Sequence, residues 1–311
     1  MSDYVTICEC FARDGLQHEP GFIPTGTKVA LIDAFTAAGF PRIEATSYSH
    51  PDQVPAFRDA YGVLAGIHRS EGVFYKATCP NLRAVERAKI DLAMGHGANE
   101  LSLLVSATEG HTQRNLRSTR IAQWAKVEEM AHAAAGHARL VGVISVAFGC
   151  PIEGAVDPGV VADDAARFAA LGVGIVALGD TTGLATPASV RAMFTRLQAA
   201  LPRVSFVAHF HDTRGTGIAN CIAALEAGCR WFDTSFGGVG GHPQKIRYGE
   251  GQTGNVATED LVDLLEASGM QTGIDLDRMM AASRLCEEAL GRQLHSQMAR
   301  AGLRQREAAH A

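Results

Sequence analysis

The chain has 311 residues, of which 47% are hydrophobic and 20% are charged, and its formal net charge is -5. Without a long basic run, this charge argues against a nucleic-acid surface, and no apolar run reaches the roughly 18 residues that a membrane span needs. The start, Met1-Ser2-Asp3-Tyr4, lacks the basic and apolar regions of a secretory signal. Seven cysteines without scaffold spacing agree with a reducing compartment, so we expect a cytoplasmic protein with no nucleic-acid or membrane partner.

Strand-like and helix-like segments alternate along most of the chain. The expected strands are residues 5–10, 42–46, 72–78, 100–105, 140–147, 174–178, 204–209 and 231–235. The expected helices are residues 25–38, 55–68, 81–94, 118–135, 158–171, 187–201, 216–227 and 258–268, and a further helix over 275–290. The strands are rich in Val, Ile and Ala rather than strictly alternating, which is typical of parallel strands buried on both faces.

Eight strand–helix units in about 265 residues match the (β/α)₈ TIM barrel in number and size. The competing architecture is a doubly wound open sheet, which usually has a glycine-rich phosphate turn after its first strand. The segment Arg13-Asp14-Gly15-Leu16 is not such a turn. The sequence therefore predicts an α/β protein with a catalytic barrel over residues 1–272. Residues 273–311 are expected to form a C-terminal helical extension whose polar end, from about residue 303, is disordered.

Two histidines stand at the end of the seventh expected strand. Side chains two residues apart on a strand point to the same side, so His209 and His211 present their imidazoles together. Neutral imidazole is the commonest metal-binding side chain, and α/β enzymes keep their chemistry at the carboxyl ends of strands. The alternative is a pair of solvated histidines at the edge of a loop.

Other polar residues also follow expected strands, and in a barrel these positions all face one mouth. They are Arg13, Asp14, Glu44, Thr46, Ser47, Asp180, Thr181, His242, Glu250 and Asn255. One carboxylate, two imidazoles and an amide oxygen suit Mg²⁺, Mn²⁺ or Co²⁺ with waters completing six ligands. Zinc is a further candidate, although it prefers four ligands and often sulfur. Each residue taken alone has a structural alternative: Asp14 as a turn former, Asp180 as a cap and Asn255 as a loop residue.

Six motifs, spread in order over about residues 4–270, resemble those of the metal-dependent barrel lyases related to 3-hydroxy-3-methylglutaryl-CoA lyase. Synthases that build 2-isopropylmalate or homocitrate share the metal site, but they usually begin with a different first motif and often carry extra C-terminal domains. The motifs are Arg13-Asp14-Gly15-Leu16-Gln17, Glu44-Ala45-Thr46-Ser47, Phe148-Gly149-Cys150-Pro151-Ile152-Glu153-Gly154, Leu178-Gly179-Asp180-Thr181-Thr182-Gly183, His209-Phe210-His211-Asp212-Thr213 and Gly254-Asn255-Val256-Ala257-Thr258-Glu259-Asp260-Leu261.

The resemblance implies a reaction and a role for each site residue. It implies retro-aldol or retro-Claisen cleavage of a 3-hydroxyacyl-CoA with a distal carboxylate, giving acetyl-CoA or a homologue and a ketoacid. We also expect a homodimer or higher homo-oligomer. Arg13 would neutralise the enolate oxygen, and Glu44 and Asp180 would support the site or accept the hydroxyl proton. The implied metal ligands are Asp14, His209, His211 and Asn255, and the implied substrate-binding residues are Gln17, Thr46 and Ser47.

The sequence departs from the family pattern in three places that bear on function. His242 stands where the lyases have a cysteine thought to serve in proton transfer, and the segment from there to Asn255 is about four residues longer. The segment His18-Glu19-Pro20 replaces Asn-Glu-Lys, whose lysine is associated with the CoA phosphates, and Phe11-Ala12 replaces the usual Gly-Pro. His242 is either a replacement general acid, since imidazole titrates near neutral pH, or an idle loop residue.

These departures leave three alternatives to an acyl-CoA lyase. The first is an aldolase acting on a related hydroxy acid without CoA, which the missing lysine suggests. The second is a condensing synthase of the same superfamily. The third is a barrel that has lost catalysis and serves in binding, which the retention of all the metal-site residues makes the weakest of the three. Cys150 belongs to a shared motif, and we expect it not to be catalytic.

Overall fold

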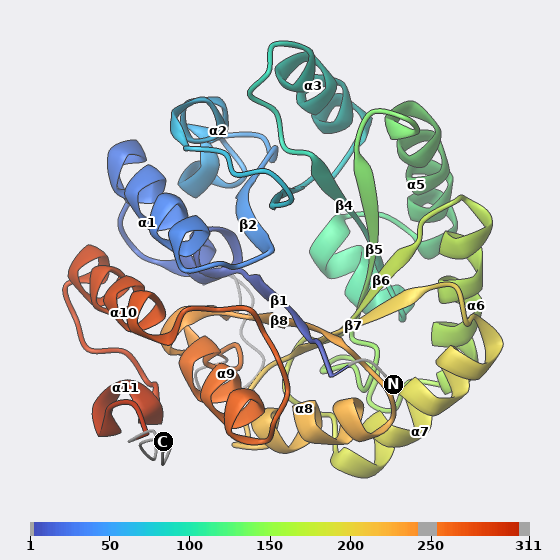
Figure 1. The fold of residues 1–311 in the computed structure, drawn as a ribbon. Helices are drawn as coiled ribbons and strands as arrows, with labels where there is room; N and C mark the ends of the chain where they lie inside the picture. Colours follow the sequence, from blue (N-terminus) through green and yellow to red (C-terminus); the bar gives the residue numbers. More distant parts are fainter. Residues whose placement is uncertain (1–2, 242–253, 305–311) are drawn as a thin grey trace.

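Eight parallel strands, hydrogen-bonded in chain order, close into a barrel in the computed structural model, which describes residues 3–241 and 254–304 (Figure 1). The TIM barrel predicted from the sequence is thus confirmed. The strands are β1 (Thr6–Glu9), β2 (Arg42–Ser47), β3 (Phe74–Thr78), β4 (Glu100–Ser106), β5 (Arg139–Ser145), β6 (Ile175–Asp180), β7 (Ser205–Phe210) and β8 (Trp231–Thr234).

A ring of helices surrounds the barrel, and several of them begin at a capping residue that can be recognised in the sequence. Asn81, Thr119 and Asp157 each accept a backbone N–H of the first helical turn, and Thr186 forms a capping box with Ser189. The helices are α1 (Thr25–Ala37), α2 (Ala60–Gly66), α3 (Leu82–Ala93), α5 (Arg120–Ala134), α6 (Pro158–Ala170), α7 (Pro187–Ala200), α8 (Gly217–Glu226) and α9 (Thr258–Ala267).

Short helical turns interrupt this regular pattern in segments that were expected to be continuous or irregular. The helix expected over residues 55–68 is divided into a 3-10 turn, η3 (Pro55–Phe57), and α2. Between β4 and α5 the chain forms α4 (Glu109–His111) and the π-helical turn η4 (Thr112–Leu116). Side-chain periodicity cannot reveal elements of three to five residues, because they do not complete two turns.

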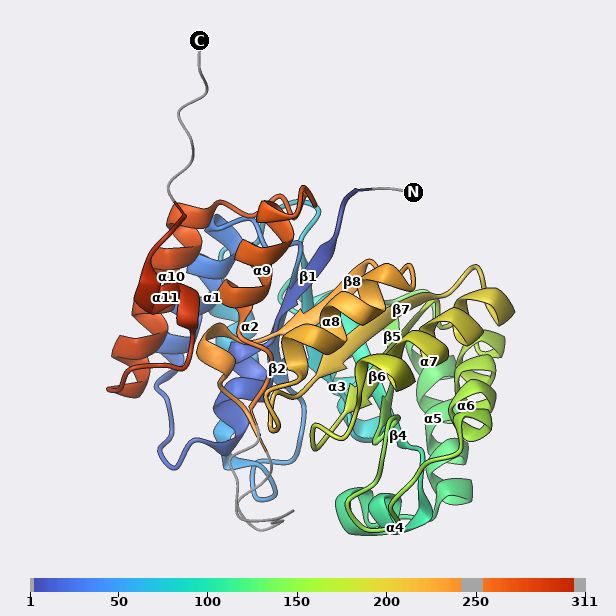
Figure 2. The same cartoon turned by 90° about the horizontal axis from the view of Figure 1, so that it is seen from below.

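The C-terminal helices pack against the flank of the barrel (Figure 2). Helix α10 (Leu276–Leu290) lies against α1 and α9, and α11 (Gln297–Ala301) lies against α9. The additional C-terminal helices are therefore present, whereas the expected disorder concerns residues that, from 305 on, lie outside the described part of the chain. None of the helices in the described ranges combines the length and hydropathy that crossing a bilayer requires.

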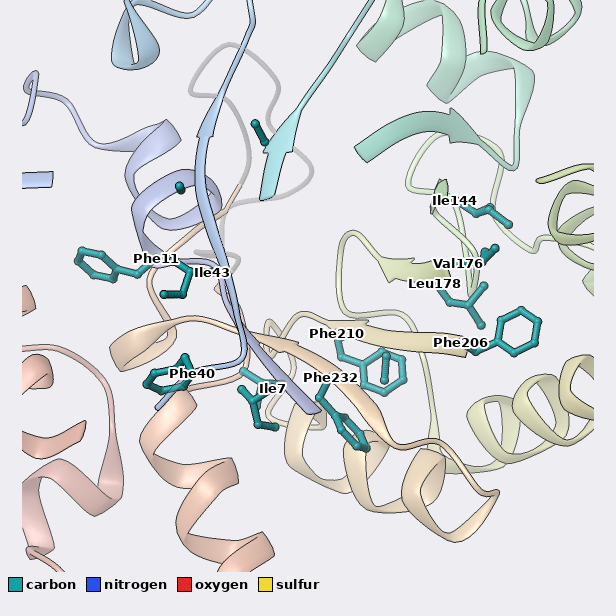
Figure 3. Packing of buried hydrophobic residues seen from close by; sticks show 14 of the residues in the cluster. Ile7, Phe11, Phe40, Ile43, Ile144, Val176, Leu178, Phe206, Phe210 and Phe232 are labelled. Atoms are coloured by element: carbon teal, nitrogen blue, oxygen red, sulfur yellow. The ribbon is translucent and has the colours of Figure 1, made fainter. Parts of the chain in front are cut away.

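The apolar core lies between the strands and the helices, because alternate strand residues point outward. Figure 3 shows such outward side chains, among them Ile7, Ile43, Val176, Phe206 and Phe232, within one buried cluster. Burying each of these side chains contributes about 1.5–3 kcal/mol.

The inward-facing residues divide the barrel interior into two walls of opposite character. We call Val141, Ile175, Ala177 and Val207, a separate buried cluster on β5, β6 and β7, the apolar wall. The charged wall faces it from β2, β3, β4 and β8. Its members are Arg42, Glu44, Lys76, Glu100 and Asp233, all at most 4% exposed.

Candidate active site

Three of the expected metal ligands come together at the carboxyl end of the barrel. Asp14, His209 and His211 each offer one ligand atom, and these atoms lie within 4.8 Å of one another. The two imidazoles follow from strand alternation on β7, with ring centroids 5.4 Å apart. Asp14 reaches them from a separate segment, so the convergence depends on closure of the barrel.

Asn255, the fourth expected ligand, is oriented by its own hydrogen bonds. Its Nδ2 donates to Asp14 Oδ2 at 2.7 Å and to the Val239 carbonyl at 3.1 Å. Its Oδ1 is buried and accepts no hydrogen bond from the described residues. A buried carbonyl oxygen left in this way costs about 1–3 kcal/mol, which a metal–oxygen bond would offset.

The electrostatics keep Asp14 in the form that a cation needs. Burial by itself would raise the pKa of Asp14, but the charges of Arg13, His209 and His211 outweigh it and hold that pKa well below its usual range. The four side chains thus supply a carboxylate, two imidazoles and one free amide oxygen. This donor set fits a divalent ion of hard to borderline character.

Arg13 lies beside this group, in the segment that follows the first strand. Strand β1 stops at Glu9, and a π-helical turn, η1 (Phe11–Gly15), follows it. The turn forms because the Cys10 carbonyl accepts the backbone N–H groups of both Arg13 and Gly15. It brings both charged side chains over the barrel mouth.

The guanidinium of Arg13 is held by two carboxylates. Its Nη1 lies 3.0 Å from Asp14 Oδ1, and its Nη2 lies 2.7 Å from Glu44 Oε1. Gln17, expected to bind substrate, accepts a longer bond of 3.4 Å from Arg13 Nη1. The planar fork is therefore fixed in orientation next to the ligand set.

The residues expected on strand two make different contacts. Glu44 Oε1 also accepts the Thr78 hydroxyl at 3.0 Å. Ser47 shares a hydrogen bond of 2.8 Å with Ser49, and Thr46 is buried beyond a register shift in the β2–β3 pairing. Glu44 thus belongs to the site, while substrate binding by Thr46 and Ser47 stays a prediction.

Asp180, at the end of β6, combines an anchored oxygen with a free one. Its Oδ1 accepts the backbone N–H groups of Leu184 at 2.7 Å and Ala185 at 3.1 Å. Its Oδ2 is buried and has no hydrogen-bond partner in the part of the chain that is described. Burial raises the pKa of Asp180 to about 6, against a smaller lowering by the hydrogen bonds from Leu184 and Ala185.

The charged wall was not anticipated from the sequence, although it touches the site. Glu44, Lys76 and Asp233 form ion pairs that continue from Arg13 to His209. The sequence could have indicated buried ion pairs, because charges in buried strands must be paired. Four charged residues stand in or at the ends of expected strands: Arg42, Glu44, Lys76 and Glu100.

Glu9 is a second residue that sequence reasoning missed. Its Oε1 accepts the backbone N–H groups of Phe11 at 2.8 Å and Phe236 at 3.1 Å, and its Oε2 accepts the Thr258 hydroxyl. It therefore joins η1, the turn η5 (Phe236–Gly238) and the start of α9. Burial raises the pKa of Glu9 to about 8.

A second group with metal-ligand geometry lies deeper in the barrel. The Sγ atoms of Cys8 and Cys10 lie 3.9 Å apart, and both approach Asp233. We assign no metal to this group, because Lys76 and Arg42 already neutralise Asp233. His242 and Glu250, expected in the long loop after β8, lie outside the described residues.

Comparisons with known proteins cover almost the whole chain. The family model described as HMGL-like matches residues 4–286. Hydroxymethylglutaryl-CoA lyase YngG of Bacillus subtilis is 38% identical over 294 residues, which cover 94% of this chain and 95% of that protein. Mitochondrial hydroxymethylglutaryl-CoA lyase of Rattus norvegicus is 37% identical over 298 residues, 96% of this chain and 89% of that protein.

Solved structures agree with these sequence matches. An HMG-CoA lyase from Acinetobacter baumannii, in complex with coenzyme A and 3-methylmalate, has a TM-score of 0.91 at 36% identity, covering 99% of this chain and 98% of that chain. The carboxyl transferase domain of Rhizobium etli pyruvate carboxylase has a TM-score of 0.71 at 18% identity, which shows the shared fold alone.

Proposed function

The chain belongs to the HMGL-like family, and from this premise we propose that it is a divalent-metal-dependent lyase that cleaves a 3-hydroxyacyl-CoA bearing a distal carboxylate. Relatives named hydroxymethylglutaryl-CoA lyase match it over nearly their whole length, so it is a carbon–carbon lyase. The proposed products are acetyl-CoA or a homologue and a ketoacid. The Acinetobacter relative with bound coenzyme A supports an acyl-CoA substrate.

The observation that carries the proposal is the convergence of Asp14, His209 and His211 with the buried Oδ1 of Asn255, which accepts no hydrogen bond from residues 3–241 or 254–304. These four residues would hold the ion, which is Mg²⁺ or Mn²⁺, with Co²⁺ and Zn²⁺ as further candidates. The bound ion would supply Lewis acidity to the substrate hydroxyl and fix its position.

We assign to Arg13 the stabilisation of the negative charge that develops on the departing enolate. Because Asp14 and Glu44 hold its guanidinium from two sides, the fork is pre-oriented and loses little freedom when substrate binds. A donor fixed where charge appears in the transition state is worth about 10²–10³ in turnover.

Two protons have to move during cleavage. The substrate hydroxyl loses one, the electrons of its O–H bond form the new carbonyl, and those of the broken C–C bond pass to the enolate. We assign the first proton to Asp180, whose Oδ2 has no hydrogen-bond partner among the described residues and whose pKa of about 6 suits a base near neutral pH. Glu44 is committed to Arg13 and Thr78 and acts as their support.

The second proton goes to the enolate carbon, and we assign it to His242. The support is the sequence position, which is that of the family cysteine, together with an imidazole pKa near 6.5. His242→Ala should slow product formation and slow proton exchange into the product's methyl group without releasing metal. Unchanged turnover and exchange would remove His242 from the mechanism and make Glu250 the next candidate.

The charge of the barrel interior supports an anionic substrate. One continuous run of ion pairs joins four cations and four carboxylates, so the run itself is neutral. A divalent ion would leave two positive charges to attract a carboxylate and the developing enolate. The members are Arg13, Arg42, Lys76, Arg139, Asp14, Glu44, Glu100 and Asp233.

One experiment separates the proposal from its alternatives. Purified protein is assayed for metal content and then for turnover of a panel of 3-hydroxyacyl-CoA thioesters and the corresponding free hydroxy acids. We expect one divalent ion per chain and cleavage of thioesters alone. Cleavage of free acids would favour an aldolase, net condensation would favour a synthase, and full activity in a thoroughly chelated enzyme would refute the metal-dependent mechanism.

Substrate contacts, the oligomeric state, the location in the cell and the extent of the catalytic unit are also proposed. Gln17, Thr46 and Ser47 are proposed to contact the substrate, and each is tested by the change in KM when it is replaced by alanine. We propose a homodimer or higher homo-oligomer in the cytoplasm, which light scattering and cell fractionation would test. The catalytic unit is proposed to be residues 1–272, with residues 273–311 as its extension.

A further inference from the structure

The ion pair between Lys76 and Asp233 lies beneath the proposed metal site, in contact with His209. We propose that Lys76 and Asp233 are positioning residues for the metal. In this role Asp233 fixes the orientation of His209, and Lys76 holds Asp233 in place while linking it to the Arg13–Glu44 pair.

The contacts of Asp233 carry the first step. Asp233 Oδ2 lies 3.4 Å from His209 Nδ1 and 3.3 Å from Lys76 Nζ. His209 and Asp233 are register partners on β7 and β8, so their side chains lie side by side on the inner face. With its Nδ1–H directed at a carboxylate, an imidazole presents Nε2 as the lone-pair donor.

Lys76 carries the second step, because it reaches across the barrel. Strands β3 and β8 are not neighbours in the barrel order, yet Lys76 pairs with Asp233 and also lies 3.7 Å from Glu44 Oε2. Glu44 in turn holds Arg13 at 2.7 Å. One buried ammonium thus joins the ligand His209 to the residue assigned to the enolate.

Lys76 also decides which way the Asp233 carboxylate faces. The other oxygen of Asp233, Oδ1, lies 3.5 Å from Arg42 Nη1. Without Lys76, Arg42 would be the remaining cation in contact with Asp233 among the described residues, and it would draw the carboxylate away from His209. The ammonium therefore balances Arg42 and keeps Oδ2 on the imidazole.

This inference rests on the proposed metal site, so the test begins with the metal and not with turnover. Mn²⁺ affinity is measured by chelator competition for wild type, Asp233→Asn and a matched control, Asp164→Asn. Asp164 is also buried and paired with an arginine, Arg120, but on α6 outside the barrel interior. We expect Asp233→Asn to weaken Mn²⁺ binding about 10–100-fold and Asp164→Asn to leave it unchanged.

Lys76→Met distinguishes positioning from simple electrostatics, because the two give opposite signs. Removing a nearby positive charge should tighten binding of a cation if charge alone matters. If Lys76 positions Asp233, its loss should weaken Mn²⁺ binding several-fold, and should weaken it no further in the Asp233→Asn background. Tighter binding in Lys76→Met, or additive losses in the double variant, would overturn the link.

A measurement on the wild-type enzyme protects the test against variants that do not fold. The protein is labelled with ¹⁵N at its histidines, loaded with Mg²⁺ and studied by NMR. The ring signals of His209 are identified by their absence from the spectrum of His209→Gln. We expect the His209 ring to carry its proton on Nδ1. A proton on Nε2 would overturn the proposal. A wild-type protein that binds no divalent ion would instead refute the proposed function, whereas wild-type affinity in folded Asp233→Asn would refute only the positioning role.

Discussion

The two walls of the barrel interior solve the problem of burial in opposite ways. On the apolar wall, Val141, Ile175, Ala177 and Val207 pack against one another and satisfy no polar group. On the charged wall, Arg42 donates to both oxygens of Glu100, at 3.1 and 3.3 Å through Nε, while Lys76 bridges two carboxylates. One barrel accommodates both walls on different strands, with the apolar wall on β5, β6 and β7 and the charged wall on β2, β3, β4 and β8.

The comparison shows where this fold accepts a cost in stability. Replacing a buried ion pair by apolar residues of similar volume is often neutral or stabilising by about 1–4 kcal/mol. A wall made wholly of such pairs is therefore not needed for folding. From its position beneath the proposed metal ligands we expect it to place them, whereas the apolar wall serves packing. The two walls should then fail in different ways when they are changed.

The largest effect is expected where the charged wall meets the proposed metal site. His211→Ala removes an imidazole, and Asp14→Asn removes the carboxylate that also orients Asn255. Either variant should lose its metal and its turnover together. Metal content by elemental analysis and a turnover assay measure this, and a variant that keeps both would exclude its residue from the ligand set.

The next effect concerns Arg13, the residue proposed to contact the departing enolate. Arg13→Lys keeps one positive charge but loses the fork that contacts Asp14 and Glu44 together. Turnover should fall by roughly 10²-fold or more, the scale of losing one fixed oxyanion donor. Mn²⁺ affinity should stay nearly unchanged, which separates this variant from the first pair. Wild-type turnover would show that the fork is not required.

The strand and helix pattern of the fold was predictable because each unit is local. The strands differ from the expected ranges by one or two residues at most of their ends, and capping residues such as Asn81 and Thr186 mark helix starts in the sequence itself. The turn η1 was not predictable, because its hydrogen bonds to the Cys10 carbonyl depend on where β1 stops.

The candidate site divides in the same way. His209 and His211 follow from strand alternation, and closure of the barrel then brings Asp14 to them. The Lys76–Asp233 pair joins residues 157 positions apart on strands that are not neighbours. A charge in a buried strand indicates that a partner exists, but only the closed barrel identifies that partner.

A smaller effect, with the opposite signature, is expected on the apolar wall. Val207→Ala, two residues before His209 on β7, removes two buried methyl groups from a fully buried position. The free energy of unfolding should fall by about 2 kcal/mol, while metal affinity and turnover should persist because no polar contact changes. Denaturant unfolding and Mn²⁺ titration measure the two quantities. Loss of metal in a folded Val207→Ala would contradict the division between the walls.

The smallest expected effect concerns the pKa of two buried carboxyl groups, Asp233, which contacts cations, and Glu9. On the charged wall, burial would raise the pKa of Asp233, but Lys76, His209 and Arg42 lower it far below its usual range. Glu9 is equally buried, and no cation pairs with it among the described residues, so its pKa is raised from 4.5 to about 8. Glu9 should therefore be held protonated in the folded protein at neutral pH.

The pH dependence of stability follows from this contrast. Between about pH 4.5 and 8 the folded state keeps the Glu9 proton while the unfolded state releases it, so the free energy of unfolding falls as pH rises. Glu9→Gln keeps an acceptor for Phe11 and Phe236 but cannot titrate. Its stability relative to wild type should rise through this window by at most about 1.4 kcal/mol per pH unit. Denaturant unfolding at several pH values measures the difference, and parallel curves for the two proteins would show that Glu9 titrates alike in both states.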